Sequence, residues 1–141
     1  MRVVIDTNVF VSSFLKGGSN PRRVIDLWRE GKIMLCLSEA ILEEYLEVLT
    51  RLGMSEEPEL DELLELFKSR GHVVFVTEVL DLSVVEGDPD DDKFVECAVT
   101  AGARHVISGD RHLRELKQYQ DVSILTPTAF LDSLGKRNEM A

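Results

Sequence analysis

The sequence is poor in several features that would point to particular protein classes. It has 2 cysteines in 141 residues, Cys36 and Cys97, and their spacing fits neither a disulfide framework nor a metal site. We therefore expect both thiols to be reduced and buried, as in a cytoplasmic protein. No apolar run approaches the length of a membrane span. Asp6 and Asn8 interrupt the first apolar stretch, so it lacks the layout of a secretory signal.

Positive charge is also scarce. The 16 lysines and arginines are outnumbered by 26 acids, which gives a formal net charge of −10. Broad, nonspecific binding to nucleic acid usually needs a basic face, so this balance argues against such a binder. It does not exclude a nuclease whose site is itself a cluster of acids, because bound metal ions bring positive charge back.

A regular alternation of strand and helix patterns is what the chain does contain. Short β-branched and apolar runs predict strands at residues 2–6, 33–37, 73–76, 105–108 and 122–125. Capping residues and apolar faces predict helices at residues 9–15, 21–30 (with Asn20 as the N-cap), 39–52, 58–70, 90–101, 111–117 and from 127 onward. This order predicts an α/β fold, a three-layer α/β/α sandwich with a central parallel sheet of about five strands. We expect one domain over residues 1–134 and a frayed tail over residues 135–141.

Two acids directly follow predicted strands. Asp6 ends the first apolar run, and Asp110 comes after the run at residues 106–109. The carboxyl ends of strands are where ligand sites form in open α/β sheets. An Asp in this place can instead cap the next helix. Thr7 and Asn8 are also available for capping, which leaves Asp6 free and lets these two residues orient its carboxylate.

The predicted helix at residues 39–52 carries four glutamates, and most glutamates on helices are solvated. At about 100° per residue, Glu44 lies at the rim of the apolar stripe, whereas Glu43 and Glu47 lie nearly opposite it. The stripe consists of Ile41, Leu42, Tyr45, Leu46, Val48, Leu49 and Leu52. Glu44 is therefore the glutamate that can turn inward.

An acidic run, Asp88-Pro89-Asp90-Asp91-Asp92, opens the helix predicted at residues 90–101. Projected back from the apolar face of that helix, Asp91 lies on the packed side, with Asp90 and Asp92 flanking it. Acids also favour helix N-termini for capping and for the helix dipole. Four carboxylates in five residues exceed what capping needs. Whether Asp91 or Asp92 is the principal acid of this run stays open.

These segments together resemble the PIN domain, the nuclease fold of VapC-type toxins and related ribonucleases. The resemblance covers about residues 2–132 and rests on four segments in order, residues 4–10, 38–49, 88–98 and 102–113. The first segment alone is weakly specific, but the ordered set at these spacings is strongly so. The chain is most similar to toxin components of toxin–antitoxin systems.

The resemblance implies which side chains form the site. The family's four acids, which act as catalytic residues and metal ligands, correspond to Asp6, Glu44, Asp91 and Asp110, and Asp88 and Asp92 are additional candidate ligands. Thr7, Asn8 and Ser108 are candidates to orient these acids, with Ser108 standing where the family often has threonine. Candidates for holding RNA phosphates are Lys16, Arg22, Arg23 and Arg111.

The resemblance also implies a chemistry and partners. It implies hydrolysis of RNA with one or two Mg²⁺ or Mn²⁺ ions, an antitoxin protein as partner, and a homodimer. Hard carboxylate oxygens select such ions over metals that prefer softer ligands. One alternative is a noncatalytic PIN-like scaffold that binds RNA or protein, against which the retention of all four acids argues. Another is an aspartyl-phosphate phosphatase, which needs a second Asp where this chain has Asn8.

Overall fold

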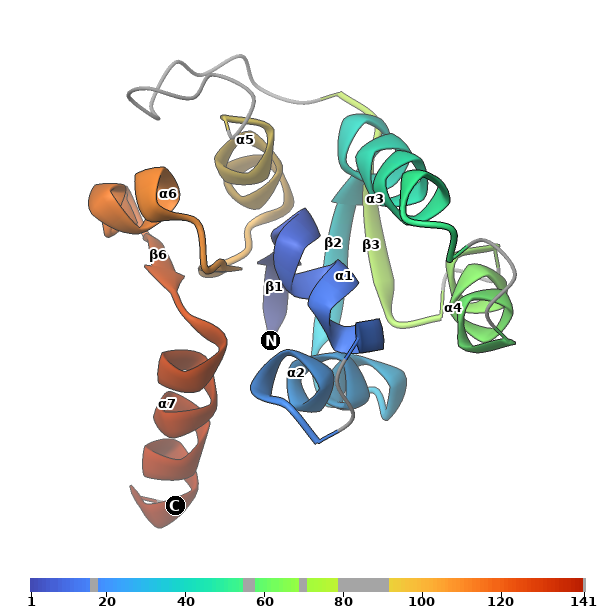
Figure 1. Ribbon diagram of the computed structural model, residues 1–141. Helices are drawn as coiled ribbons and strands as arrows, with labels where there is room; N and C mark the ends of the chain where they lie inside the picture. Colours follow the sequence, from blue (N-terminus) through green and yellow to red (C-terminus); the bar gives the residue numbers. More distant parts are fainter. Residues whose placement is uncertain (16–17, 55–57, 69–70, 79–91, 141) are drawn as a thin grey trace.

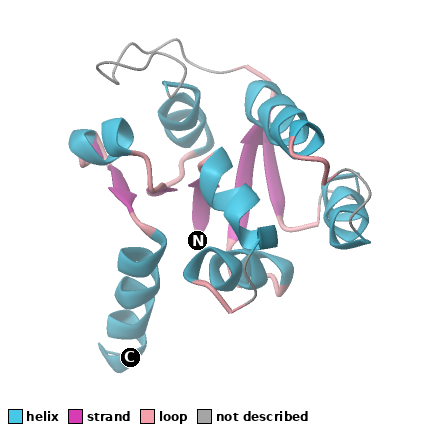
Figure 2. Ribbon diagram, in the orientation of Figure 1, coloured by secondary structure: helices cyan, strands magenta, loops and turns pink. Residues whose placement is uncertain are grey.

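The computed structural model describes residues 1–15, 18–54, 58–68, 71–78 and 92–140. Within these ranges a sheet is flanked by helices (Figures 1 and 2). The strands are β1 (Arg2–Ile5), β2 (Met34–Ser38), β3 (Val73–Val76), β4 (His105–Ile107), β5 (Gln118–Tyr119) and β6 (Val122–Leu125). The helices are α1 (Thr7–Leu15), α2 (Asn20–Arg29), α3 (Glu39–Arg51), α4 (Pro58–Lys68), α5 (Asp92–Ala101), α6 (Arg111–Leu116) and α7 (Pro127–Met140).

The strand order places β1 and β4 side by side in the middle of the sheet. The order is β3-β2-β1-β4-β6-β5, and all neighbours except β5 and β6 are parallel. From β1 the chain builds outward to β3, then returns to the opposite side of β1 to form β4. The topological switch point therefore lies between β1 and β4, where α/β sheets open a crevice at their carboxyl ends. Asp6 and Asp110 follow these two strands.

All five strands expected from the sequence are present, and the parallel α/β architecture is confirmed. The expectation of about five strands missed a sixth, β5, which pairs antiparallel with β6. It has two residues and turns tightly into β6, with Gln120 at a φ of 51°. A segment this short carries no detectable alternation of polar and apolar residues. The sheet is thus mixed at one edge and parallel where it carries the candidate acids.

The helices lie where right-handed crossovers place them. Helices α1, α2 and α3 share contacts, and α1 and α2 lie in front of the strands (Figure 1). Helix α5 packs on β1, β2, β3 and β4. Because the chain reverses its direction across the sheet between β3 and β4, this crossover puts α5 on the opposite face. The central strands are covered on both sides, which explains why Val3, Val4 and Ile5 are all buried.

Helix starts follow local capping chemistry. The Ser38 hydroxyl accepts a hydrogen bond from the Ile41 N–H at 3.3 Å, so Ser38 caps α3 as expected. The expectation that Asn20 caps the next helix was wrong. Ser19 caps α2 by accepting from the Arg22 N–H at 3.3 Å, and Asn20 is already helical. The Asn20 amide instead donates to the Thr128 hydroxyl at 2.7 Å, which ties the start of α2 to the start of α7.

A stack of aromatic rings fills the core beneath the carboxyl end of β1. The rings of Phe10 and Tyr45 are parallel, with centroids 4.2 Å apart. Phe67 continues the stack from Phe10 at 6.0 Å and contacts Trp28 at 5.3 Å. The Tyr45 hydroxyl donates to the Ile5 carbonyl. This bond links α3 to the residue before Asp6, so the core fixes the backbone that carries the first acid.

Further expectations concern the two cysteines, the apolar stripe of α3, the C-terminal tail and the absence of a membrane span. Cys36 and Cys97 are free and buried, and burial raises their pKa values to about 11 and about 12, so both thiols stay protonated at neutral pH. Leu52, assigned to the apolar stripe of α3, is 53% exposed because the helix ends at Arg51. Helix α7 extends to Met140 and buries Phe130, and the expectation that residues 135–141 fray stays a prediction. No helix of the described ranges has the length and apolar character needed to span a membrane.

Candidate active site

Asp6 is the centre of the candidate site. Its side chain is buried, at 3% exposure, directly beyond the end of β1. The Asn8 backbone N–H donates to Oδ1 at 2.9 Å, and the Ser108 hydroxyl donates to Oδ2. Its own N–H donates to the Ile107 carbonyl at 3.0 Å, which extends the pairing of β1 with β4. Both carboxylate oxygens are therefore held in place, Asn8 acting here through its backbone.

The pKa of Asp6 is raised above its ordinary value of 3.8. Burial is the largest cause, since it disfavours the charged form. The hydrogen bonds from Ser108 and Asn8 lower the pKa, and the charges of Asp110 and Glu44 raise it further. Asp6 thus lies within electrostatic reach of two more acids that the sequence singled out.

Asp110 is linked to Asp6 through one hydroxyl group. The Asp110 backbone N–H donates to the Ser108 Oγ at 2.9 Å, while the same hydroxyl donates to Asp6. Asp110 Oδ1 accepts from the Leu113 N–H at 3.1 Å. It therefore caps the start of α6, as the alternative interpretation predicted, and at the same time lies near Asp6. Capping occupies one of its oxygens and leaves a charge at the crevice.

Glu44 faces the site from α3. Its Oε2 accepts from the Thr7 hydroxyl, and its Oε1 lies 2.6 Å from Nζ of Lys93. The side chain of Glu44 is 30% exposed and therefore partly buried, whereas Glu43 and Glu47 are exposed to solvent. The half-buried position of Glu44 and the exposure of Glu43 and Glu47 agree with the helical projection, in contrast to Leu52 at the end of the helix. Thr7, expected to orient Asp6, orients Glu44 instead.

Lys93 was missed from the sequence. It lies in the first turn of α5, with its ammonium group against Glu44 and 5.6 Å from the centroid of the Phe94 ring. Its side chain is 21% exposed. One available signal was its position, because it is the first basic residue after the run of four acids at residues 88–92. Its partner Glu44 lies 49 places earlier in the chain, and the sequence around it gives no indication of this ion pair.

The acidic run is described only at its end. Asp92 is buried, at 8% exposure, as the first residue of α5. Asp88 and Asp91, like the candidate RNA-binding residue Lys16, lie outside the described residues. Because Lys93 reaches Glu44, the first turn of α5 lies beside the other acids. Asp92 therefore lies in the same helical turn as Lys93, the residue that pairs with Glu44.

The chemistry of these groups suits a hard divalent cation. The negative charges of Asp110 and Glu44 contribute to the raised pKa of Asp6, and a bound cation would offset this negative charge. In the described part of the chain, no three acidic, histidine or cysteine side chains are placed together as metal ligands. The donor type fits such an ion, and residues 88–91 hold the further acids from which the family's ligand set would be completed.

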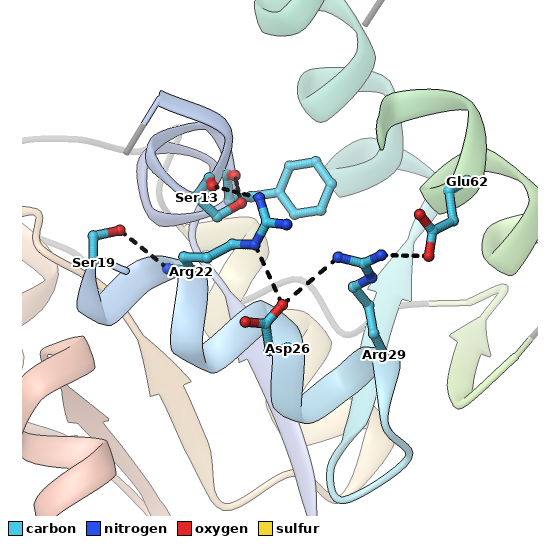
Figure 3. Close-up of polar contacts among 7 residues, drawn as sticks. Ser13, Ser19, Arg22, Asp26, Arg29 and Glu62 are labelled. Atoms are coloured by element: carbon cyan, nitrogen blue, oxygen red, sulfur yellow. Dashed lines mark hydrogen bonds and ion pairs between the residues drawn. The ribbon is translucent and has the colours of Figure 1, made fainter. Parts of the chain in front are cut away.

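The basic residues expected to hold RNA have different surroundings. Figure 3 shows the Arg22 guanidinium directed at Asp26, 3.3 Å away, and at the Ser13 carbonyl, 3.5 Å away. Asp26 also pairs with Arg29, which reaches Glu62 on α4. Arg22 therefore joins α2 to α1 in this structure. Two further candidates lie on helices, Arg23 with an exposed side chain on α2 and Arg111 as the first residue of α6.

Comparisons with known protein sequences match most of the chain. The sequence profile of the PIN domain matches residues 2–112, which include Asp6, Glu44 and Asp110. The uncharacterized protein MJ1680 of Methanocaldococcus jannaschii is 30% identical over 148 aligned positions, which cover 96% of this chain and 93% of that protein. The profile spans the strands on both sides of the switch point together with the helix that carries Glu44. The chain therefore belongs to the PIN domain family, whose members are typically nucleases.

Proposed function

We propose that the protein is a divalent-metal-dependent endoribonuclease, which hydrolyses phosphodiester bonds within RNA. The observation that carries this proposal is the buried Asp6 carboxylate at the switch point of the sheet, whose pKa is raised partly by the charges of Asp110 and Glu44. Burying a charge beside two like charges is costly unless a counter-charge binds there. Membership of a family of nucleases supports hydrolysis of nucleic acid as the reaction.

Four acids would hold one or two Mg²⁺ or Mn²⁺ ions, namely Asp6, Glu44, Asp110 and Asp91, with Asp88 and Asp92 as further candidates. An ion bound in such a site lowers the pKa of a coordinated water and offsets charge on the attacked phosphate. The protein's own contribution is orientation. Ser108 and the Asn8 amide fix the two oxygens of Asp6, and the Thr7 hydroxyl fixes one oxygen of Glu44.

Lys93 adds a fixed positive charge beside the acids. Its ammonium group is a compact donor within reach of Glu44 and so lies at the rim of the cluster. We propose that it helps to offset the negative charge of the RNA phosphate as the substrate enters. Arg23 and Arg111 are candidates for phosphates farther along the strand, together with Lys16 and, if its ion pair opens, Arg22.

The biological role that we propose is that of a toxin in a toxin–antitoxin system. It rests on the resemblance of the sequence to VapC-type toxins, which also suggests a homodimer and an antitoxin protein as partners. Two buried, protonated cysteines suit a cytoplasmic protein, because such thiols need no oxidising compartment.

Circular RNA provides a direct test, since it has no ends for an exonuclease. We expect linearisation of a single-stranded RNA circle with Mn²⁺ or Mg²⁺ and none with a chelator. Asp6→Asn should lower the rate at least 100-fold, because it removes the central charge from the site. Asp132→Asn, at an exposed position on α7, is the matched control and should cleave normally.

The same experiment separates the alternatives. A noncatalytic scaffold would bind the circle without cutting it under any metal condition. A phosphatase would release phosphate from a phosphomonoester while leaving the circle intact. Equal cleavage by the wild type and Asp6→Asn would mean that the nuclease activity, if present, does not depend on this cluster.

A further inference from the structure

A cavity of about 440 Å³ opens beside the acid cluster. It lies between the first turns of α1, α2 and α7 and the loop that follows β4. Its volume falls within the roughly 300–1,000 Å³ of typical small-molecule sites. Two of its lining residues are neighbours of the acids along the chain. The backbone of Asn8 holds Asp6, and Gly109 lies between Ser108 and Asp110.

Among the described residues, the lining of this cavity carries hydrogen-bonding groups but no charged side chain. Its polar side chains are amides and hydroxyls, those of Asn8, Ser12, Asn20 and Thr128. Val9, Pro21 and Pro127 supply apolar surface between them. A phosphate group would be expected to meet arginine or lysine. Apolar walls with a few uncharged donors and acceptors suit a flat, neutral, polar-edged ligand.

We propose that this cavity binds the base of an RNA nucleotide next to the scissile phosphate. The inference rests on the proposed ribonuclease function, because RNA is the ligand that would bring a base to this place. Single-stranded RNA is recognised through bases that are turned out of the stack and bonded along their edges. The cavity adjoins the acids through Asn8 and Gly109, so a base bound in it belongs to a nucleotide adjoining the cleaved bond.

Two local features prepare the cavity for such a ligand. The Asn20 side chain is held by its bond to the Thr128 hydroxyl at 2.7 Å, so its amide is already oriented at the cavity wall. An amide offers a donor and an acceptor together, the pattern that pairs with the edge of a base. At Gly109 a Cβ atom would meet no described atom within 4 Å, so the loop between Ser108 and Asp110 is open at this lining residue of the cavity.

The test uses the intact protein and short RNAs with a randomised window, whose cleavage products are sequenced. The wild type should show a base preference at one position beside the cut. An abasic ribonucleotide at that position should slow cleavage about tenfold, because the bonding groups of the cavity are then left without their partner. Thr128→Val, which removes a hydroxyl at an exposed helix start and keeps the shape, should change the order of preferred bases there.

A second variant closes the cavity instead of changing its chemistry. Ser12→Phe places a ring in the cavity, so a base can no longer bind there. The tenfold difference in rate between the base-containing and abasic RNAs should then disappear, leaving the two rates equal within about twofold. Thr50→Val, exposed on α3 and not in the lining of the cavity, is the matched control and should keep the wild-type profile. Thermal unfolding of each variant shows whether the fold is retained.

Failure of this inference and failure of the proposed function give different results. If all the variants cleave RNA with the wild-type profile, the cavity does not read a base and the ribonuclease proposal stands. If the wild type cleaves no RNA, fluorescence anisotropy with labelled RNAs decides the matter. If the wild type binds the abasic RNA more weakly than the base-containing RNA, and Ser12→Phe binds both equally, the cavity is a base site in a noncatalytic protein. Equal binding of both RNAs by the wild type overturns the inference.

Discussion

The ammonium group of Lys93 lies 2.6 Å from Oε1 of Glu44, and this ion pair joins the first turn of α5 to the middle of α3. The side chains are only 21% and 30% exposed, so water screens the pair less than a surface pair. Thr7 holds the other oxygen of Glu44 from the start of α1. Three helices thus meet at one carboxylate, beside the acids that follow β1 and β4.

Lys93→Met should destabilise the metal-free protein. The change removes the charge but keeps the length of the side chain, and it leaves Glu44 beside Asp6 without its cation. We expect the free energy of unfolding to fall by about 0.5–1 kcal/mol, the upper part of the range for accessible ion pairs. Lys68→Met, which breaks an exposed 3.8 Å pair with Glu65, should change it by less than about 0.3 kcal/mol. Urea denaturation with a chelator present measures both, and equal losses would contradict the special position of Lys93.

Glu44→Gln and Glu43→Gln should differ sharply in RNA cleavage. Glu44 faces Thr7 and Lys93 at the site, whereas Glu43 is exposed. Loss of the Glu44 charge should reduce the rate of RNA cleavage about 10–100-fold, which is the typical effect of removing a group that supports a metal site. Glu43→Gln should stay within about twofold. Single-turnover rates with saturating Mn²⁺ compare them, and a larger effect at Glu43 would refute the assignment of faces on α3.

Asp6→Asn should stabilise the metal-free protein, and the gain should grow with pH. The pKa of Asp6 is raised in the folded state, so the folded protein keeps this proton to a higher pH than the unfolded chain does. The ionised carboxylate therefore begins to cost stability above the ordinary pKa of 3.8, and its full cost is reached above the folded pKa. The gain at neutral pH should be on the order of 1 kcal/mol. Denaturation curves should start near pH 3, below the ordinary pKa of 3.8, and continue to pH 8; a gain that is constant or shrinking over this whole range would show that the charge of Asp6 does not destabilise the protein.

Ser108→Ala should raise the pKa of Asp6 further. The hydroxyl donates to Asp6 and accepts from the Asp110 N–H, and its bond to Asp6 lowers that pKa. Because Ser108 is fully buried, the lost bonds should also cost about 1–3 kcal/mol of stability. Ser108→Thr keeps the hydroxyl and is the control. NMR titration of the Asp6 carboxyl carbon measures the change in pKa. An unchanged pKa in the alanine variant would mean that the Ser108 hydroxyl does not interact with Asp6.

Mg²⁺ should raise the melting temperature of the wild type. An ion that binds only the folded site stabilises it by an amount that grows with the logarithm of its concentration, about 2.7 kcal/mol at 100 times the dissociation constant. Asp6→Asn should abolish most of this increase, while Asp132→Asn should retain it. Differential scanning fluorimetry over a range of Mg²⁺ concentrations would detect the difference, and identical shifts in all three proteins would place the ion elsewhere.

The parts of the fold that were predictable from the sequence are those with a long, clear pattern. Helix α3 has 13 residues, enough for its period to separate Glu44 from Glu43. β1 and β4 are buried apolar runs, so the position of Asp6 and Asp110 after them was visible. The two-residue strand β5 has too few residues for any period. The assignment of Asn20 as the N-cap of α2 was wrong, because Ser19 accepts from the Arg22 N–H and Asn20 bonds instead to Thr128, 108 places away.

Within the candidate site, the acids were the residues with a local sequence signal, and their roles stay a prediction. Each acid stands beside a local signal, the end of an apolar run or the rim of a helical stripe. The bonds that hold the acids, from Ser108 to Asp6 and from Lys93 to Glu44, join distant parts of the chain. The assignment of Thr7 to Glu44, rather than to Asp6, depends in the same way on how α1 lies against α3.

The place of β4 beside β1 has a consequence during protein synthesis. Asp6 leaves the ribosome 102 residues before Ser108, and Asp110 follows two residues later. β4 takes its place between β1 and β6, so the last strand of the sheet must also emerge before this part is complete. A nascent chain that has not yet released β4 therefore lacks the assembled carboxylate cluster, so the activity that we propose for this cluster cannot begin before the sheet is closed.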